Sequence, residues 1–520
     1  MYHKAPFMGL CLALIAGILC ELLLPGVIPP ALTAGSAAAL FLIHLYATRQ
    51  PPDLTQRLRW AFGGAALLLV FAIGQRRLAA ERLPPPALTG EWETLNVQLE
   101  DSPVEKSKTV RAQALASDTD GRRHRLLLYV AKDSASLALK RGDRLLIRVK
   151  EREQDFSYYT SRDIFRQGYV SDGNWRLTGG YPSFHPVRLA SEIRNALLQR
   201  LRAYLAPEAF PLAAALTLGY KREVSRETQD AFADAGTSHL LAVSGLHIGF
   251  IYAALRLLFG WKTRKRWLRI LQCAGLTAGL WAYVFLCGLP ASAIRSGIMF
   301  TLIGIADLTR SKGTTLNSLF SAAFLMLIVR PFYLFDIGFQ LSFSAVLGIV
   351  TLNTTLRSLL PETGGIAGKL TDMMTVSTAA QLGTLPVTLY CFRQFPTYFL
   401  LSNLWAIPLA TLLVYGTLAV MAGGGVPVAG PLACRIVEYG FAALTYGMEW
   451  IGNLPAALLH LASFSLADAC CTALLIASGR VYAQNRKTAW LYSLLGCVIF
   501  LLCSGIAKDF RGILPTFAEG

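Results

Sequence analysis

Apolar runs long enough to cross a bilayer recur along most of this chain. Three of them open the sequence, near residues 6–24, 30–47 and 60–74. Such runs predict membrane-spanning helices, so we expect a polytopic α-helical membrane protein with about thirteen spans. The remaining candidate spans lie near residues 239–259, 267–288, 291–308, 315–329, 337–352, 374–392, 396–421, 434–451, 465–479 and 488–506.

A polar segment of a different kind separates the first three runs from the rest. Short alternating stretches at 93–99, 109–116, 125–130 and 143–150 are divided by Asp, Ser and Gly turn signals. This pattern predicts β-strands, and several short strands in so small a segment indicate a barrel or sandwich. An amphipathic stripe over 191–205 then predicts a helix that leads back to the membrane.

The expected organisation follows from this change of pattern. Residues 1–78 form a three-helix membrane segment, and residues 79–187 form the β-domain. Residues 188–207 form the amphipathic linker, 208–506 the main membrane domain and 507–520 a short tail. The apolar piece 210–218 is too short to span, and the sequence leaves open whether it is re-entrant.

The net charge of +17 fits either a nucleic-acid partner or the positive-inside bias of membrane proteins. With a cytoplasmic N-terminus, the basic loops at 262–266, 310–312, 357–369 and 480–487 all fall on the cytoplasmic side. We therefore expect the β-domain and the C-terminus to be extracytoplasmic, and much of the excess charge to be topological. Arg76, Arg77 and Arg82 depart from this rule, which long translocated domains obey weakly.

The familiar catalytic and metal motifs are missing from the sequence. It contains no H-E-x-x-H pair, no C-x-x-C pair and no Walker A lysine loop. All ten cysteines lie in apolar runs, as expected of small apolar side chains in membrane helices. We therefore predict no cofactor, no metal site and no enzyme activity for this chain.

The most unusual span begins with Gly236-Thr-Ser-His-Leu-Leu-Ala-Val-Ser-Gly-Leu-His247. On a helix Ser244 and His247 share a face, while His239 lies off that face. Polar groups at membrane depth usually face a bundle interior or a water-filled path. The alternative is ordinary helix packing through small residues, with the serine and histidine satisfied locally.

Three later segments carry polar residues beside helix breaks. Arg295 follows Pro290 and needs a carboxylate, carbonyls, water or an anionic ligand, unless it extends to the outer interface. Asp336 precedes an apolar run and could cap it, with Gln340 one turn further on. Gln381 stands before Pro386. Broken helices with polar residues are typical of transporter sites, so these segments together predict a lined path.

These motifs resemble the ComEC family of competence proteins. Gly236–His247 is similar to the signature of that family, and further similar blocks are Ala215–Tyr220, Arg295 with Ser296, and Phe335–Phe343. The resemblance implies an inner-membrane channel for single-stranded DNA in natural transformation, with an OB-like extracytoplasmic barrel. Many family members carry a C-terminal metallo-β-lactamase-like domain, which we do not expect here because the sequence ends shortly after its last apolar run.

An OB-like barrel suggests base stacking on aromatic side chains in a basic groove. The aromatic side chains of a small domain are more often part of its core. The sequence therefore does not decide which aromatic residues stack with bases. The candidates interleave aromatic with basic residues: Tyr129, Phe156, Tyr158, Tyr159, Phe165, Tyr169 and Trp175, with Arg162, Arg166 and Arg176.

The leading hypothesis is therefore a channel for single-stranded DNA in the bacterial inner membrane. Its expected partners are DNA, the bilayer, a separate DNA receptor, a nuclease and a cytoplasmic motor, while monomer and homo-oligomer both remain open. The alternatives are a secondary transporter for a small anionic or nucleotide-like solute and an intramembrane hydrolase that uses Ser244 with a histidine. The residues expected to line the DNA path are His239, Ser244, His247, Arg295, Asp336, Gln340 and Gln381.

Overall fold

The computed structural model divides the chain into two compact units, which we describe separately. Unit 1 is Met1–Glu192 with Phe320–Asp336, and unit 2 is Ile193–Leu319 with Ile337–Gly520. The structure describes residues 5–49, 56, 58–82, 90–101, 103–117, 123–153, 164–180, 185–260, 263, 265–309, 314–362, 364–485, 489–490, 492–498 and 500–501.

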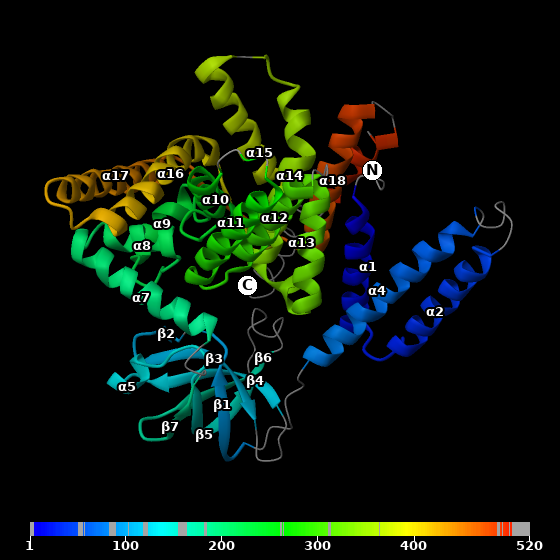
Figure 1. Cartoon of the computed structure of the whole chain (residues 1–520), viewed down its shortest axis with the longest axis horizontal. Helices are drawn as coiled ribbons and strands as arrows, with labels where there is room; N and C mark the ends of the chain where they lie inside the picture. Colours follow the sequence, from blue (N-terminus) through cyan, green and yellow to red (C-terminus); the bar gives the residue numbers. More distant parts are fainter. Residues whose placement is uncertain are drawn as a thin grey trace, which may run out of the picture. The chain divides into compact units, whose positions relative to one another are not determined.

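Unit 1 opens with three helices, α1 (Pro6–Leu23), α2 (Pro30–Ala47) and α4 (Arg59–Glu81), drawn in blue in Figure 1. Glycines allow α1 and α4 to approach closely. A Cβ atom added at Gly74 would lie 2.6 Å from the Leu14 carbonyl oxygen, so a larger residue would push the helices apart. The Gln75 side chain donates to the Ile28 carbonyl at 2.9 Å, which satisfies a buried amide between apolar helices.

The β-domain of unit 1 is a closed barrel. Five strands pair in the order β1–β3–β4–β6–β5, and β5 pairs back with β1. Only β4 and β6 run parallel, which is the pattern of an OB-like barrel. The elements are β1 (Trp92–Leu99), β2 (Val104–Glu105), β3 (Thr109–Ser117), β4 (Arg123–Ala131), α5 (Ser134–Leu137), β5 (Arg144–Glu153), β6 (Ile164–Val170) and β7 (Trp175–Gly179).

Period-two alternation explains the barrel. Along β5 the side chains of Leu145, Ile147, Val149 and Glu151 are buried, and their neighbours on the strand are exposed. Strand residues alternate between the two faces of a sheet, so the apolar set fills the barrel interior. The same alternation located β1, β3, β4 and β5 in the sequence, and the structure confirms these four predictions. It adds β2, β6 and β7, which the sequence pattern missed.

Strand β4 is covered on its outer side as well. Arg125 donates to the Glu81 carbonyl at 3.2 Å, and its guanidinium lies 5.6 Å from the ring of Phe332 in the 3-10 helix η2 (Pro331–Phe335). Leu127, next along the same face, is fully buried. The end of α4 and η2 therefore pack over this part of the barrel within unit 1.

Unit 2 is helical and holds the predicted signature. Helices α14 and α15, the yellow-green pair in Figure 1, pack directly on each other. A Cβ atom at Gly383 of α15 would lie 2.5 Å from the Ser344 carbonyl oxygen of α14, so glycine is required for this contact. Two short strands, β8 (Gln394–Pro396) and β9 (Leu458–His460), pair beside them.

Most of the remaining helices overlap the predicted apolar runs, but α10 begins six residues later and α15 nine residues earlier than those runs predicted. The amphipathic helix α7 begins in unit 1 and ends in unit 2, and α13 passes from unit 2 into unit 1. The helices are α7 (Pro186–Tyr204), α8 (Phe210–Leu218), α9 (Arg226–Asp234), α10 (Gly245–Phe259), α11 (Arg266–Leu286), α12 (Ala291–Thr309), α13 (Thr315–Val329), α14 (Ile337–Arg357), α15 (Gly365–Phe392), α16 (Phe399–Gly423), α17 (Ala429–Gly452) and α18 (Leu466–Asn485).

Within the described residues, 8 helices are long and apolar enough to cross a membrane, and α10 and α13 are shorter apolar helices. The predicted fold class, a polytopic helical membrane protein with an OB-like barrel, is confirmed. The total number of spans stays a prediction.

Candidate functional site at the start of α10

Helix α10 begins at Gly245, six residues later than the run from 239 predicted. Ser244 is the N-cap, and its hydroxyl accepts from the Leu246 N–H at 3.2 Å. The Ser244 N–H donates in return to Nδ1 of His247 at 3.1 Å, which completes a capping box. The expectation that Ser244 lies inside a helix was wrong, because its hydroxyl satisfies a backbone donor at the helix end instead.

The first residue of α10 packs directly on α12. A Cβ atom at Gly245 would lie 2.5 Å from Nη2 of Arg295 and 2.7 Å from Oγ of Ser296. Only glycine permits this approach without moving the guanidinium or the helix. The structure therefore brings together two segments that the sequence singled out separately.

Arg295 lies inside unit 2, with 5% of its side chain exposed. Its Nε donates to the Ser342 hydroxyl of α14 at 2.8 Å, and its Nη1 lies 3.7 Å from the Met299 sulfur. The guanidinium also lies 5.7 Å from the Phe343 ring. Among the described residues no carboxylate lies within ion-pair distance of Arg295. The guanidinium therefore contacts neutral groups inside the unit. The side chain does not extend to the surface of the unit, as the alternative in the sequence analysis required.

His247, two residues after Gly245 on α10, is fully buried. Its Nδ1 serves the capping box, and its Nε2 has no hydrogen-bond partner within the described part of the chain. The imidazole packs edge-on against Phe250, whose carbonyl accepts from the Tyr415 hydroxyl of α16 at 2.9 Å. A buried polar atom without a partner is costly, so it marks a place where a further polar group would be stabilised.

The other predicted residues occupy different positions. His239 lies in the non-helical segment before α10 and its side chain is exposed. Gln340 and Gln381 are partly buried on α14 and α15. Asp336 follows η2 and belongs to unit 1, so it is not part of the cluster in unit 2.

Sequence reasoning missed Ser342 and Phe343 as contacts of Arg295. Both lie in the Phe335–Phe343 block, but within that block sequence reasoning singled out Asp336 and Gln340. One sequence signal could have revealed Ser342. A buried arginine needs a hydrogen-bond acceptor, and the apolar Phe335–Phe343 block contains few other polar residues that could accept.

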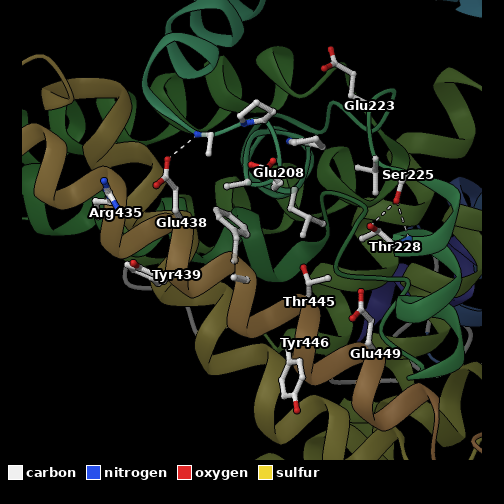
Figure 2. A pocket seen from close by; sticks show the side chains of 18 residues that line it. Glu208, Glu223, Ser225, Thr228, Arg435, Glu438, Tyr439, Thr445, Tyr446 and Glu449 are labelled. Carbon is white, nitrogen blue, oxygen red and sulfur yellow. Dashed lines mark hydrogen bonds between the residues drawn. The ribbon is translucent and has the colours of Figure 1, made fainter.

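A separate cavity of about 710 Å³ lies between α8, α9 and α17 in unit 2. Figure 2 shows four glutamates around it and one arginine, Arg435. One of them, Glu438, accepts the Ala206 N–H at 2.8 Å. An acidic lining repels a phosphate backbone, so this cavity does not suit DNA. The glutamates are Glu208, Glu223, Glu438 and Glu449.

The described residues contain no group of three His, Cys, Asp or Glu side chains that could hold a metal ion. The guanidinium of Arg295 and the serine hydroxyls beside it are suited to an anion, since such groups donate to phosphate or carboxylate oxygens.

Comparison with known families decides the relationship of the chain. A family described as "Competence protein" matches residues 216–506, which is more than half of the chain and includes α10, α12 and α14. The chain belongs to the competence protein family. This confirms the family resemblance drawn from the Gly236–His247 signature.

Three curated relatives align with parts of the chain. ComE operon protein 3 of Bacillus subtilis (strain 168) is 28% identical over 222 residues, which are 42% of this chain and 27% of that protein. The uncharacterized protein YcaI of Escherichia coli (strain K12) is 22% identical over 307 residues, 57% of this chain and 40% of YcaI. An uncharacterized protein of Aquifex aeolicus (strain VF5) is 26% identical over 260 residues, 48% of this chain and 58% of that protein.

The aligned parts thus cover less than two thirds of each of these relatives. No solved structure matches the chain.

Proposed function

We propose that this protein is a channel that passes single-stranded DNA through the bacterial inner membrane during DNA uptake. The observation that supports this most is the buried Arg295, which contacts the start of α10 and has only neutral partners among the described residues. Helix N-termini carry partial positive charge, and α10 begins beside this guanidinium. The two features together favour an anion.

The neutral surroundings of Arg295 suit transport better than tight binding. A conduction path needs sites that attract the ion and still release it. A phosphate that meets one arginine, a serine hydroxyl and a helix N-terminus gains charge-assisted hydrogen bonds without becoming trapped by a cluster of cations. In this proposal Ser244, His247, Gln340 and Gln381 line the same path as Arg295.

The remaining parts have roles consistent with this path. The N-terminus is cytoplasmic, and the barrel and the C-terminal residues are extracytoplasmic, where the barrel receives the incoming strand. His239 and Asp336 are further proposed contacts of the strand. A separate DNA receptor, a nuclease and a cytoplasmic motor complete the system.

A second candidate is a secondary transporter for a small anionic or nucleotide-like solute. The non-helical entry to α10 and the buried arginine favour it, because broken helices and helix N-termini form many anion sites in transporters. The barrel has no evident role in that function.

The hydrolase is the least supported candidate. Ser244 Oγ lies 3.1 Å from His247 Nδ1, which is close enough for proton transfer. The same hydroxyl already caps α10, however, and among the described residues no carboxylate orients the imidazole.

The test measures uptake of labelled DNA in a transformable strain that lacks its own channel and carries this chain. Arg295→Ala and His247→Ala are compared at equal membrane levels with Arg357→Ala, whose partner Asp372 lies at 2.9 Å near a helix end. We expect Arg295→Ala to lower uptake at least about tenfold, the effect of about 1.4 kcal/mol, and Arg357→Ala to have little effect. Full uptake with both Arg295→Ala and His247→Ala would reject the proposal that these residues line the path. In the native host, normal transformation after deletion of this chain, together with loss of uptake of a solute, would favour the transporter.

A further inference from the structure

The barrel has one covered face and one open basic face. OB folds commonly bind nucleic acid on the face of their second and third strands, which are β3 and β4 here. Arg125 on the outer side of β4 is paired with Glu81 and Glu100, and Leu127 beside it is fully buried. The usual binding face is therefore partly occupied by the end of α4 and by η2.

The outer side of β5 is different. Arg144, Arg148, Lys150 and Arg152 all point outward, because they alternate with the buried residues of this strand. Consecutive outward residues on a strand are about 6.8 Å apart, so the last three form an evenly spaced row of cations. No ion pair among the described residues involves any of the four.

Two exposed aromatic side chains flank this row. Trp92 of β1 is opposite Lys150 across one edge of β5, and Tyr169 of β6 is opposite Lys150 across the other edge. Each has 54% of its surface exposed. Directly opposed strand residues lie within contact distance, so the two rings and the ammonium form one continuous patch.

The neighbouring outward positions carry no acidic side chain. On β1 they are Thr94, Asn96 and Gln98, opposite Arg148, Leu146 and Arg144. On β7 the exposed Arg176 is opposite Leu146 and adds another cation. These outward positions are thus basic or neutral, and the exposed carboxylate of Glu153, which follows Arg152 on β5, is paired with Arg166.

We propose that the outer face of β5, flanked by Trp92 and Tyr169, is a binding surface for single-stranded DNA. This inference rests on the proposed function and identifies where the incoming strand first contacts the barrel. The row of cations follows the phosphate backbone, and the two rings stack with bases, which is how strands are bound without sequence preference. Cations and exposed Trp and Tyr side chains are also found at lipid surfaces, so binding to anionic vesicles is measured as the competing outcome.

The sequence candidates for stacking fit this surface only in part. Tyr169 and Arg176 belong to it, whereas Arg166 is buried and paired with Glu151 and Glu153. Trp175 packs on the barrel core. Phe156, Tyr158, Tyr159 and Arg162 lie outside the described residues. Trp92 was not among the candidates.

The experiment uses the whole protein in nanodiscs of zwitterionic lipid and follows binding of a labelled single-stranded oligonucleotide over a series of salt concentrations. Arg148→Glu/Lys150→Glu is compared with Lys106→Glu/Lys108→Glu, an equal charge reversal on the exposed β2–β3 turn of the same barrel. We expect the first pair to weaken binding at least about tenfold and to lower the salt slope by about 1.4, since each lost phosphate contact removes about 0.7. The second pair should change both values little.

The aromatic part is tested separately with Trp92→Ala/Tyr169→Ala. Loss of stacking should weaken binding about tenfold or more and leave the salt slope unchanged, because stacking releases no counterions. Both side chains are half exposed, so the barrel should fold normally, which retained hydrogen-exchange protection of β1 and β5 would verify.

If Arg148→Glu/Lys150→Glu bound the oligonucleotide as tightly as the wild-type protein does, the proposed binding surface would be rejected. If that variant bound DNA normally but no longer bound vesicles containing phosphatidylglycerol, the surface would belong to anionic lipid, and the inference would also be wrong. If Arg295→Ala abolishes uptake while the β5 variants bind and take up DNA normally, only the barrel surface is rejected. If the wild-type protein neither binds nor takes up DNA, the proposed function itself fails.

Discussion

Arg125 in the barrel and Arg295 in the helical unit are both buried, with 8% and 5% exposed, but they are neutralised differently. Arg125 lies 3.7 Å from a carboxylate oxygen of Glu81 and 3.4 Å from one of Glu100. Arg295 has the Ser342 hydroxyl, the Met299 sulfur and the Phe343 ring. Two carboxylates thus balance the charge of Arg125. No carboxylate among the described residues balances the charge of Arg295.

This difference is the reason why we treat Arg125 as a structural cation and propose Arg295 as a functional one. Burial of a charge costs several kcal/mol, and a carboxylate partner with good hydrogen bonds offsets most of that cost. An arginine kept in an apolar unit without such a partner lowers stability, which is consistent with our proposal that an anionic ligand supplies the missing charge. The comparison also predicts that the two arginines respond in opposite ways to replacement.

The largest effect is expected where α10 meets Arg295. Gly245→Val places a side chain where a Cβ atom alone comes within 2.5 Å of the guanidinium. Such overpacking costs up to about 3 kcal/mol. Acting in full on the conducting state, this cost corresponds to roughly a hundredfold loss of DNA uptake, the largest loss we expect. The matched control is Gly249→Ala, whose new Cβ would meet Phe300 at an ordinary 3.7 Å. Equal loss with both variants would show that the helix needs small residues in general and not contact with Arg295.

The comparison is tested directly by replacing each arginine with methionine. Arg125→Met leaves Glu81 and Glu100 without their shared cation, so we expect the unfolding free energy to fall by about 2 kcal/mol. Arg295→Met removes a charge that has no carboxylate partner among the described residues, so stability should stay within about 1 kcal/mol of the wild type or rise. Thermal unfolding of the purified proteins measures both. Equal destabilisation would mean that Arg295 is also a structural cation.

The barrel also contains a carboxyl group, that of Asp101, whose ionisation lowers the stability of the barrel. Burial raises the pKa of Asp101 to about 6, although its side chain accepts the Gln113 N–H at 2.7 Å. The unfolded chain therefore releases this proton at lower pH than the folded barrel, and barrel stability falls as pH rises from about 4 to about 6. Asp101→Asn keeps the acceptor and should raise stability by about 1 kcal/mol above pH 6, with little change near pH 4.

Hydrogen exchange of β1 and β3 peptides, corrected for intrinsic rates, measures this pH dependence. A stabilisation by Asp101→Asn that is equal at pH 4 and pH 7 would contradict the raised pKa.

The smallest effect distinguishes a cap from a nucleophile. If Ser244 acts as the cap of α10, Ser244→Ala costs about 1 kcal/mol and Ser244→Gly only a few tenths. DNA uptake should therefore decrease slightly with alanine and hardly at all with glycine. Both variants remove the hydroxyl that a nucleophile needs. If both proteins were equally inactive, the result would support the hydrolase hypothesis.

The apolar runs predicted the helices well because membrane helices must satisfy their backbone internally and are long and apolar. Alternation likewise predicted β1, β3, β4 and β5. The start of α10 was misplaced because the residues from 239 to 244 are as apolar as a span, and only the capping geometry of Ser244 reveals the break. Strand β6 was missed because its pattern is interrupted by Gly168, which packs on Val149.

The contacts of Arg295 could not be derived from sequence spacing. Ser342 lies 47 residues away in the chain and is brought to the guanidinium by the packing of α12 against α14. In contrast, the arginine itself could be singled out in the sequence, because a charge within an apolar run needs a physical reason. Its role in the site stays a prediction. The sequence thus identified which residue requires a partner, and the fold identified the partner.

The central claim is that a DNA strand passes beside Arg295, and photo-crosslinking tests it most directly. A benzophenone amino acid is placed at position 343, whose ring lies 5.7 Å from the guanidinium, or at position 303, a partly exposed site on α12. Labelled DNA is then irradiated during uptake. We predict that the strand crosslinks at position 343 and not at position 303. Uptake that continues without crosslinking at 343, or with equal crosslinking at both positions, would contradict the proposed path.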